Sequence, residues 1–414
     1  MRVIVTGGAG YIGSHVVRAL QRAGHAPIVL DDLSTGHLAL VERNGVELIQ
    51  GDVGSRDVLE QAFTSHRPEA VIHLAGLALV GESVDDPAPY FAVNTVAGYT
   101  LLEAMRAHGV DRIVFSSTCA VYGVPEELPI TERSPLEPVS PYGASKLAFE
   151  RMLFAYARAY GLKALSLRFF NVAGADPDGD LGEMRHEETH LLPLLLRAAR
   201  RRELFELFGT NYRTRDGSAE RDYVHVVDIA RAFVHALERL EVIDPLPFGG
   251  ALNLGTGRGT TVREMIAATE RELGCEIAVK TVPRRAGDPP ALVADPSLSR
   301  KVLGFGARHD VATMIRSANR FLEAEIDRGA DVFKSYLPGG SMPNPNGGSS
   351  RVRFGEAVVS AGILDEEVVA HALKIQRDRD GIGESHKLLG LILLEMGAIS
   401  NDQLIGILKR INVR

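Results

Sequence analysis

Tyr142 and Lys146 stand four residues apart in the segment SPYGASK, at the start of a helical pattern that runs to about Tyr160. On a helix this spacing places both side chains on one face, with the ammonium group near the phenol. A phenol with its usual pKa of about 10 is a poor base at neutral pH, but a neighbouring cation stabilises the phenolate. The pair therefore predicts a tyrosine that accepts a proton from a substrate hydroxyl. Hydroxyl side chains at Ser116 and Thr118, just upstream, could share the substrate's hydrogen bond.

A glycine-rich turn near the N-terminus predicts a dinucleotide site. The letters VTGGAGYIG occupy residues 5–13, after a strand-like run and before a helical pattern. Glycines such as Gly7, Gly10 and Gly13 allow a tight turn and a close approach of the backbone to a pyrophosphate at a helix N-terminus. Asp31 ends the second strand-like run, 18 residues beyond Gly13. A carboxylate there accepts hydrogen bonds from a ribose 2′-hydroxyl and repels a 2′-phosphate, so NAD is favoured over NADP.

The next two strand-like runs end on further candidates for the cofactor site. Asp52 and Val53 follow the third run and could bracket the adenine. Leu74, Ala75 and Gly76 follow the fourth run and could line the cofactor channel. Because ligands of open parallel sheets bind outside the carboxyl ends of the strands, these positions are predicted to meet at one edge.

Longer stretches of the chain resemble known proteins. The glycine loop, the Tyr142 and Lys146 pair and Thr118 resemble the extended short-chain dehydrogenases/reductases. Within that group, six stretches are similar to the UDP-glucose 4-epimerase family: GYIGSH at 10–15, VGES at 80–83, SPYG at 140–143, RFFNVAGA at 168–175, RDYVHV at 221–226 and PRRAGD at 283–288. The resemblance spans residues 1 to about 325.

The resemblance implies NAD-dependent epimerisation at C4 of a UDP-hexose, such as UDP-glucose or UDP-galactose. Tyr142 would take the proton of the sugar 4-hydroxyl while hydride leaves C4, and Lys146 and Thr118 would complete the catalytic set. The transient 4-keto sugar would then turn over and regain the hydride on its other face. NAD would stay bound throughout, and the family leads us to expect a homodimer.

The same resemblance assigns the binding residues. The implied cofactor contacts are Gly7, Gly10, Tyr11, Ile12, Gly13, Asp31, Asp52, Val53, Leu74, Ala75, Gly76, Asn94, Ser116, Tyr142, Lys146 and Phe170. The implied substrate contacts are Thr118, Asn171, His190, Arg221, Arg285, Asp288 and Leu292. His190 stands where many members have Asn. Leu292 stands where certain members have Tyr beside the sugar, which predicts room for an N-acetyl group.

Two alternative functions stay open on sequence. A nucleotide-sugar 4,6-dehydratase uses the same scaffold, but its relatives place Asp-Glu directly after the threonine, where this chain has Cys119 and Ala120. The chain could instead be a non-catalytic NAD-binding scaffold or sensor that works through its C-terminal region. Retention of Tyr142 and Lys146 argues against that second alternative.

The elements that must position these residues follow from hydrophobic patterning. Short β-branched runs alternate with helical patterns at 3–6, 27–30, 46–50, 70–74, 112–116 and 164–169. Strands joined by helical crossovers form a parallel sheet covered on both faces. We therefore predict a doubly wound α/β (Rossmann) domain over 1–170. A smaller α/β domain for the nucleotide sugar is predicted over 171–330, with helices near 190–202 and 228–240.

The C-terminal part has a different pattern. Residues 331–350 are rich in Pro, Gly, Asn and Ser, which predicts a flexible linker. Beyond it, FGEAVVSAGI at 354–363 recurs at 389–398 as LGLILLEMGA, which predicts a small, mainly helical, duplicated module over 351–414. The module resembles the N-terminal domain of type II secretion and pilus-assembly ATPases, where paired motifs bind cyclic di-GMP. The second copy has Ile411 where Gln is expected, so a protein-docking or structural role and cyclic di-GMP binding both stay open.

Composition narrows the remaining classes. A hydrophobic fraction of 45% over 414 residues provides for two or three packed domains and excludes global disorder. The net charge of −7 gives no electrostatic reason to expect nucleic acid as a partner. No apolar stretch reaches membrane-spanning length, and a cytoplasmic location is predicted. Two cysteines, Cys119 and Cys275, are too few for a disulfide framework or a zinc site, so no metal is expected.

Overall fold

The computed structural model describes residues 1–185, 188–241, 250–285 and 288–329, together with a few residues between 364 and 398. The chain divides into two compact units, Met1–Pro338 and Gly339–Arg414. The predicted linker and most of the predicted duplicated module lie outside the described residues. In the second unit, the described residues include Ala372 and Leu393, both helical and fully buried.

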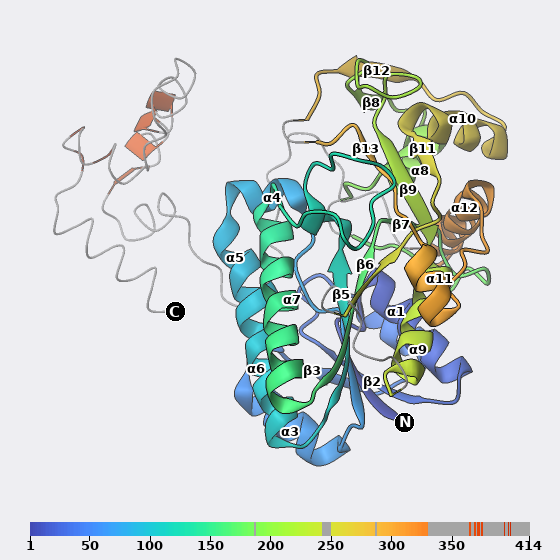
Figure 1. Cartoon of the computed structure of the whole chain (residues 1–414). Coiled ribbons are helices and arrows are strands. Elements are labelled where there is room, and N and C mark those ends of the chain that lie inside the picture. The colour runs from blue at the N-terminus through green and yellow to red at the C-terminus, as the bar shows by residue number, and fades with distance from the viewer. Residues whose placement is uncertain are drawn as a thin grey trace. The chain divides into compact units, whose positions relative to one another are not determined.

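A seven-stranded sheet forms the centre of the first unit (Figure 1). Its strands are β1 (Arg2–Thr6), β2 (Ala26–Asp31), β3 (Leu48–Gln50), β4 (Ala70–His73), β5 (Arg112–Thr118), β6 (Lys163–Phe169) and β10 (Ala251–Leu254). They run in the order β10-β6-β5-β4-β1-β2-β3, and every pair is parallel. The order reverses between β1 and β4, which creates a topological switch point at the carboxyl edge. The predicted parallel, doubly wound sheet is thereby confirmed.

Helices cover both faces of this sheet (Figure 1). One face carries α1 (Tyr11–Arg22), α2 (Leu38–Asn44), α9 (Val226–Arg239) and α11 (Ser297–Leu303). The other carries α3 (Arg56–His66), α6 (Ala97–Ala107) and α7 (Pro141–Tyr160). Three further helices, α4 (Val80–Asp85), α5 (Pro87–Phe91) and the π-helix η1 (Ala92–Val96), lead into α6 and pack beside α7.

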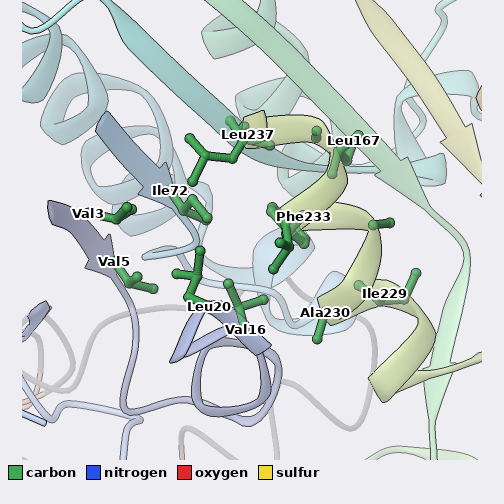
Figure 2. Packing of buried hydrophobic residues seen from close by; sticks show 14 of the residues in the cluster. Val3, Val5, Val16, Leu20, Ile72, Leu167, Ile229, Ala230, Phe233 and Leu237 are labelled. Atoms are coloured by element: carbon green, nitrogen blue, oxygen red, sulfur yellow. The ribbon is translucent and has the colours of Figure 1, made fainter. Parts of the chain in front are cut away.

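The two apolar cores follow from strand alternation. Val3 and Val5 of β1 belong to the cluster beneath α1 and α9, whereas Ile4 between them belongs to the cluster beneath α3, α6 and α7. Successive side chains of a strand point to opposite faces, so both faces of β1 are buried. Figure 2 shows the first cluster, in which side chains of β1, α1 and α9 converge.

The predicted boundary at residue 170 does not separate these layers. Both α9 and β10 come from beyond it, yet β10 pairs with β6 and α9 packs on α1. The chain thus crosses to the second region after β6, returns to the sheet, and leaves it again. The reason is packing: β10 hydrogen-bonds to the edge of β6, and seven residues of α9 are buried in the apolar cluster on this face of the sheet.

The second region is a smaller α/β layer, as predicted. In it, β9 (Glu220–His225) pairs with β7 (Asn171–Ala173), β11 (Gly259–Thr261) and β13 (Ala291–Leu292). A separate parallel pair is β8 (Phe205–Phe208) with β12 (Val279–Val282). An apolar cluster holds α8 (Leu191–Arg201), α10 (Val262–Leu273) and α12 (Val311–Asp327) together. Among the described residues, no helix has both the length and the apolar character needed to cross a membrane.

Candidate active site

The glycine loop packs without space for side chains. Gly7 has φ +71°, and a Cβ on it would lie 2.5 Å from the backbone nitrogen of Ala75. A Cβ on Gly13 would lie 2.0 Å from the carbonyl oxygen of Gly7. Helix α1 begins at Tyr11, and its N-cap residue, Gly10, has no side chain to satisfy the first amides. The loop and the helix start therefore fit the diphosphate of a dinucleotide.

Asp31 is fixed beside this loop at the end of β2. Its Oδ2 accepts from the backbone N–H of Ala9 at 2.9 Å, and its Oδ1 accepts from that of Leu33 at 2.9 Å. Burial raises the pKa of the carboxyl, while these two hydrogen bonds lower it. The carboxylate stands where the sequence predicts a ribose acceptor.

The third strand also ends on its predicted candidates. Asp52 accepts from the backbone N–H of Gly54 at 2.7 Å, which holds a turn directly after β3. Val53 is buried and belongs to the same apolar cluster as Ile4 and Leu30, beneath α3 and α6.

The segment after the fourth strand, which the sequence predicts to line the cofactor channel, lies next to Lys146. A Cβ on Gly76 would lie 2.7 Å from Asn94 Oδ1 and 3.0 Å from Lys146 Nζ. The Asn94 amide accepts from the N–H of Leu77 at 2.9 Å and donates to its carbonyl oxygen at 3.1 Å. It also donates to Ser145 Oγ at 3.0 Å. Asn94 lies in the π-helix, a distortion common at functional sites, and its side chain ties the segment after β4 to helix α7.

Local sequence explains why helix α7, which carries the predicted catalytic pair, begins at Pro141. Ser140 is the N-cap of α7 and accepts from the N–H of Gly143 at 3.2 Å, while Pro141 occupies the first helical position. Tyr142 and Lys146 follow within two turns, and both are buried. Lys146 Nζ donates to the carbonyl oxygen of Ser116 at 3.2 Å. The predicted pair and the end of β5 are thus brought together.

Burial acts on both ionisable groups of the pair. It raises the pKa of Tyr142 to about 12, while a hydrogen bond with Thr118 lowers it. It lowers the pKa of Lys146 to about 8, while Glu150 raises it. The ammonium form of Lys146 is therefore close to titration at physiological pH, and Tyr142 needs further positive charge to ionise. Bound NAD⁺ would add such a charge at the nicotinamide ring.

An apolar wall adjoins the end of β5. Cys119, Phe170 and Leu292 belong to one buried cluster with Tyr122 and Leu147. Leu292 of β13 is 9% exposed, and it pairs with Arg221 of β9. Burial raises the pKa of the Cys119 thiol to about 12, so this group stays neutral.

The predicted diphosphate ligands come from β9 and the segment before β13. Arg221 of β9 is 9% exposed and donates from Nη2 to Asp288 Oδ1 at 2.5 Å. Asn171 begins β7 and pairs with Tyr223, two residues from Arg221 along β9. Arg285 stacks with its Cζ 4.1 Å from the centre of the Phe208 ring. The structure thus joins Arg221 to Asp288, places Asn171 on the strand next to β9, and stacks Arg285 on Phe208 of β8.

His190 lies in an ion-pair cluster. It is the N-cap of α8, and its Nδ1 is 2.6 Å from Glu183 Oε1. Arg185 Nε donates to the same oxygen at 2.7 Å. Burial lowers the pKa of His190, but Glu183 outweighs it and raises the pKa above its ordinary value. Neither Glu183 nor Arg185 was predicted, because their proximity to His190 arises only from the fold.

A second unpredicted group lies behind Lys146. Glu150, Arg168 and Ser117 form a fully buried hydrogen-bonded cluster. One signal could have found it: Glu150 is four residues beyond Lys146, on the helix face that carries the predicted catalytic pair.

Comparison with known proteins agrees with this geometry. Residues 3–255, more than half of the chain, match the sequence pattern of the "NAD dependent epimerase/dehydratase family". The chain belongs to this family. Within the epimerase/dehydratase family, the UDP-glucose 4-epimerase of Azospirillum brasilense is 45% identical over 344 residues, which cover 82% of this chain and 96% of that protein.

Solved structures of epimerases have the same fold. A UDP-glucose 4-epimerase from Brucella ovis in complex with NAD is 46% identical, with a TM-score of 0.73 over 77% of this chain and 98% of its own. One from Bifidobacterium longum in complex with NAD⁺ and UDP is 36% identical, with a TM-score of 0.73 over 79% and 99%. The first unit of this family member is therefore comparable to whole epimerase chains.

Proposed function

We propose that the protein interconverts UDP-glucose and UDP-galactose by inverting C4, with NAD retained as a catalytic cofactor. One observation carries the proposal: the Tyr142 and Lys146 face of α7 meets Thr118, Gly76 and Asn94 at the edge that also holds the glycine loop. The similarity to UDP-glucose 4-epimerases over nearly their whole length supports it.

The side chains divide the chemistry among themselves. NAD⁺, when bound, supplies the acceptor for the C4 hydride. Tyr142 accepts the proton of the 4-hydroxyl and returns it to the product, with Thr118 sharing the hydrogen bond to the phenol. Lys146, held on the Ser116 carbonyl, contributes positive charge that favours the phenolate.

Inversion requires that the sugar turn over while the nucleotide stays bound. Arg221 and Arg285 supply the positive charge that a diphosphate needs, and Asn171 and Asp288 offer hydrogen-bonding groups beside it. The wall that contains Leu292 is apolar and therefore offers few hydrogen bonds that would fix the orientation of the sugar. A firm grip on the diphosphate and a weak grip on the hexose let the 4-keto sugar present either face.

The protein as purified tests this function. It should carry NAD(H) and convert UDP-galactose to UDP-glucose without added cofactor. Tyr142→Phe should keep the cofactor but lose at least about 100-fold in kcat, because general base catalysis contributes that order. Purification of the protein without bound NAD(H), or undiminished turnover by Tyr142→Phe, would refute the proposal. Either result would favour the alternative of a non-catalytic scaffold.

The dehydratase alternative needs an acid and a base directly after Thr118. That place holds Cys119, whose pKa is raised to about 12 by burial, and Ala120. Neither can exchange a proton at neutral pH, which supports epimerisation. Formation of a 4-keto-6-deoxy sugar from the purified protein would reverse this conclusion.

The Leu292 wall supports activity on N-acetylated sugars as well. Leu292 is smaller than Tyr and has no hydroxyl, so we expect it to leave more room beside the sugar than Tyr would, as an acetamido group requires. Turnover of UDP-N-acetylglucosamine should accompany turnover of UDP-glucose, and Leu292→Tyr should reduce the first selectively. An inert N-acetylated substrate would exclude this extension.

Apolar side chains on the α4 to α6 surface support homodimerisation. Val84 and Val96 are 61% and 60% exposed, and Phe91 and Tyr99 are 40% exposed. Large exposed apolar side chains on neighbouring helices favour an interaction site. Light scattering should give a dimer mass, and Val96→Glu should give a monomer mass. The cytoplasmic location and the two roles considered for residues 351–414 stay predictions of the sequence.

A further inference from the structure

Three consecutive residues at the end of β5 each contact one residue on a single face of α7. That face continues one turn beyond the catalytic pair to Glu150, which is completely buried. The contacts are Thr118 with Tyr142, Ser116 with Lys146 and Ser117 with Glu150. The strand and the helix are therefore held in one register by the two catalytic contacts and by a third contact that the mechanism does not use.

Arg168 completes the third contact from the neighbouring strand. It pairs with Ser117 across β5 and β6, and it donates to Glu150 from Nε at 3.0 Å and from Nη2 at 2.6 Å. Its Nη1 donates to the Tyr122 hydroxyl at 3.0 Å, which in turn donates to Asn253 of β10 at 2.7 Å. Glu150 thus has both carboxylate oxygens bound, and Arg168 is fixed on two sides.

Fold stability alone does not account for this buried ion pair. Removing two charges from water costs several kcal/mol per ion, and a well-packed apolar pair of similar volume is often as stable or more so. The pair also stands one helical turn from Lys146, where a fixed negative charge acts on the ammonium group.

The other groups that face Lys146 supply no competing negative charge. On β4, His73 has its pKa lowered to about 3 by burial and by Lys146, so it is neutral at physiological pH. The π-helix contributes the Asn94 amide, and β5 contributes the Ser116 carbonyl and the Phe115 ring. Among the described residues, Glu150 is therefore the charged group that supports the ammonium form of Lys146.

We propose that Glu150, held by Arg168 and Ser117, is a positioning residue that keeps Lys146 protonated and in register with the end of β5. It contacts neither substrate nor cofactor and acts through Lys146. This role rests on the proposed epimerase function. It makes Glu150 a residue on which the pH range of catalysis depends.

The proposal fixes the direction of a pH effect. Lys146 is an ammonium below its pKa and loses its charge above it. Burial without Glu150 would lower that pKa further, so the high-pH decline of kcat should begin at lower pH. Loss of one nearby opposite charge predicts a shift of about one pH unit. KM for the UDP-sugar and the content of bound NAD should stay within about twofold.

Three variants of the full-length protein separate positioning from simple structural loss. Glu150→Gln removes the negative charge and keeps the shape of the side chain. The high-pH decline of its kcat should therefore begin at lower pH than in the wild type. Glu150→Asp keeps the charge but shortens the side chain, so it should retain a near-normal pH profile even where its Tm falls. The matched control is Glu325→Gln, which removes the charge of a buried carboxylate on α12 that is paired with the partly exposed Arg43 (2.6 Å), and should lower Tm without moving the profile.

The pH profiles of these variants decide whether Glu150 positions Lys146. An unshifted kcat decline in Glu150→Gln, or an equal shift in Glu325→Gln, overturns the proposal. If Glu150→Gln does not fold, the double variant Glu150→Leu with Arg168→Met removes both charges and must show the shifted profile. Failure of every one of these variants to fold would assign the pair to folding and likewise overturn it. An inactive wild-type protein would instead refute the proposed function.

Discussion

Replacing Gly13 with Ala is the sharpest perturbation of the cofactor loop. The added Cβ would lie 2.0 Å from the Gly7 carbonyl oxygen and 2.8 Å from Gly8 Cα. Real Cβ contacts stay beyond 3.0 Å, and both neighbours are backbone atoms that cannot rotate away. The loop must therefore move by about 1 Å, which overpacking data place at about 1–3 kcal/mol. The move also endangers the hydrogen bond from Gly10 N–H to the Gly7 carbonyl (3.2 Å).

This cost should appear mainly as lost cofactor affinity, because we expect the diphosphate of NAD to bind the displaced amides. At about 1.4 kcal/mol per tenfold, a loss near 3 kcal/mol weakens NAD binding about 100-fold. The nucleotide content of the purified variant and calorimetric titration of NAD measure the effect. Gly306→Ala is the control, since a Cβ there meets nothing within 4 Å. Full NAD content and unchanged affinity in Gly13→Ala would refute the assignment of the loop to the diphosphate.

Three further predictions address neighbouring groups. Asp31→Asn should raise the affinity for NADP relative to NAD by at least about tenfold, because a carboxylate repels the 2′-phosphate; an unchanged ratio in titrations would contradict its role. Tyr11→Phe removes the hydrogen bond to the Gly174 carbonyl (2.5 Å), which ties the cofactor loop to β7, and should speed NAD release several-fold in a stopped-flow displacement assay. Burial lowers the pKa of His15 to about 4 and of His73 to about 3, so stability should be intact above about pH 6.5 and fall as pH drops toward 4; a flat Tm over that range would contradict it.

Local patterns predicted most of the sheet and the cofactor edge. Six of the seven strands, the loop before α1 and the Tyr142 and Lys146 face are local features, because each depends on periodicity, glycine placement or helical spacing within a few residues. The comparison with epimerase structures confirms the parallel doubly wound fold and the family.

Features that depend on long-range contact were not predictable in this way. The seventh strand, β10, is a four-residue run whose partner β6 lies more than 80 residues earlier. The sequence of α9 predicts an amphipathic helix but does not show which part of the fold it covers. Only its packing on α1 places it on the seven-stranded sheet. The Glu150 and Arg168 pair joins a helix to a strand 18 residues away, and no local rule pairs these two charges.

His190 shows the limit of transferring a role by position. The resemblance assigned it to the substrate, and the structure places its ring on Glu183, 2.6 Å away. Its contact with a UDP-sugar stays a prediction. His190→Asn, the residue that many family members carry, should leave KM for UDP-glucose within about threefold if Glu183 is its main partner.

The return of hydride to the same carbon is the central claim, and isotopic labelling measures it most directly. UDP-glucose deuterated at C4 should give UDP-galactose that retains deuterium at C4, as read by proton NMR, with no label in water and no released NADH. Loss of the label to solvent, or accumulation of free NADH, would contradict a mechanism in which Tyr142 moves only the hydroxyl proton and the cofactor never leaves.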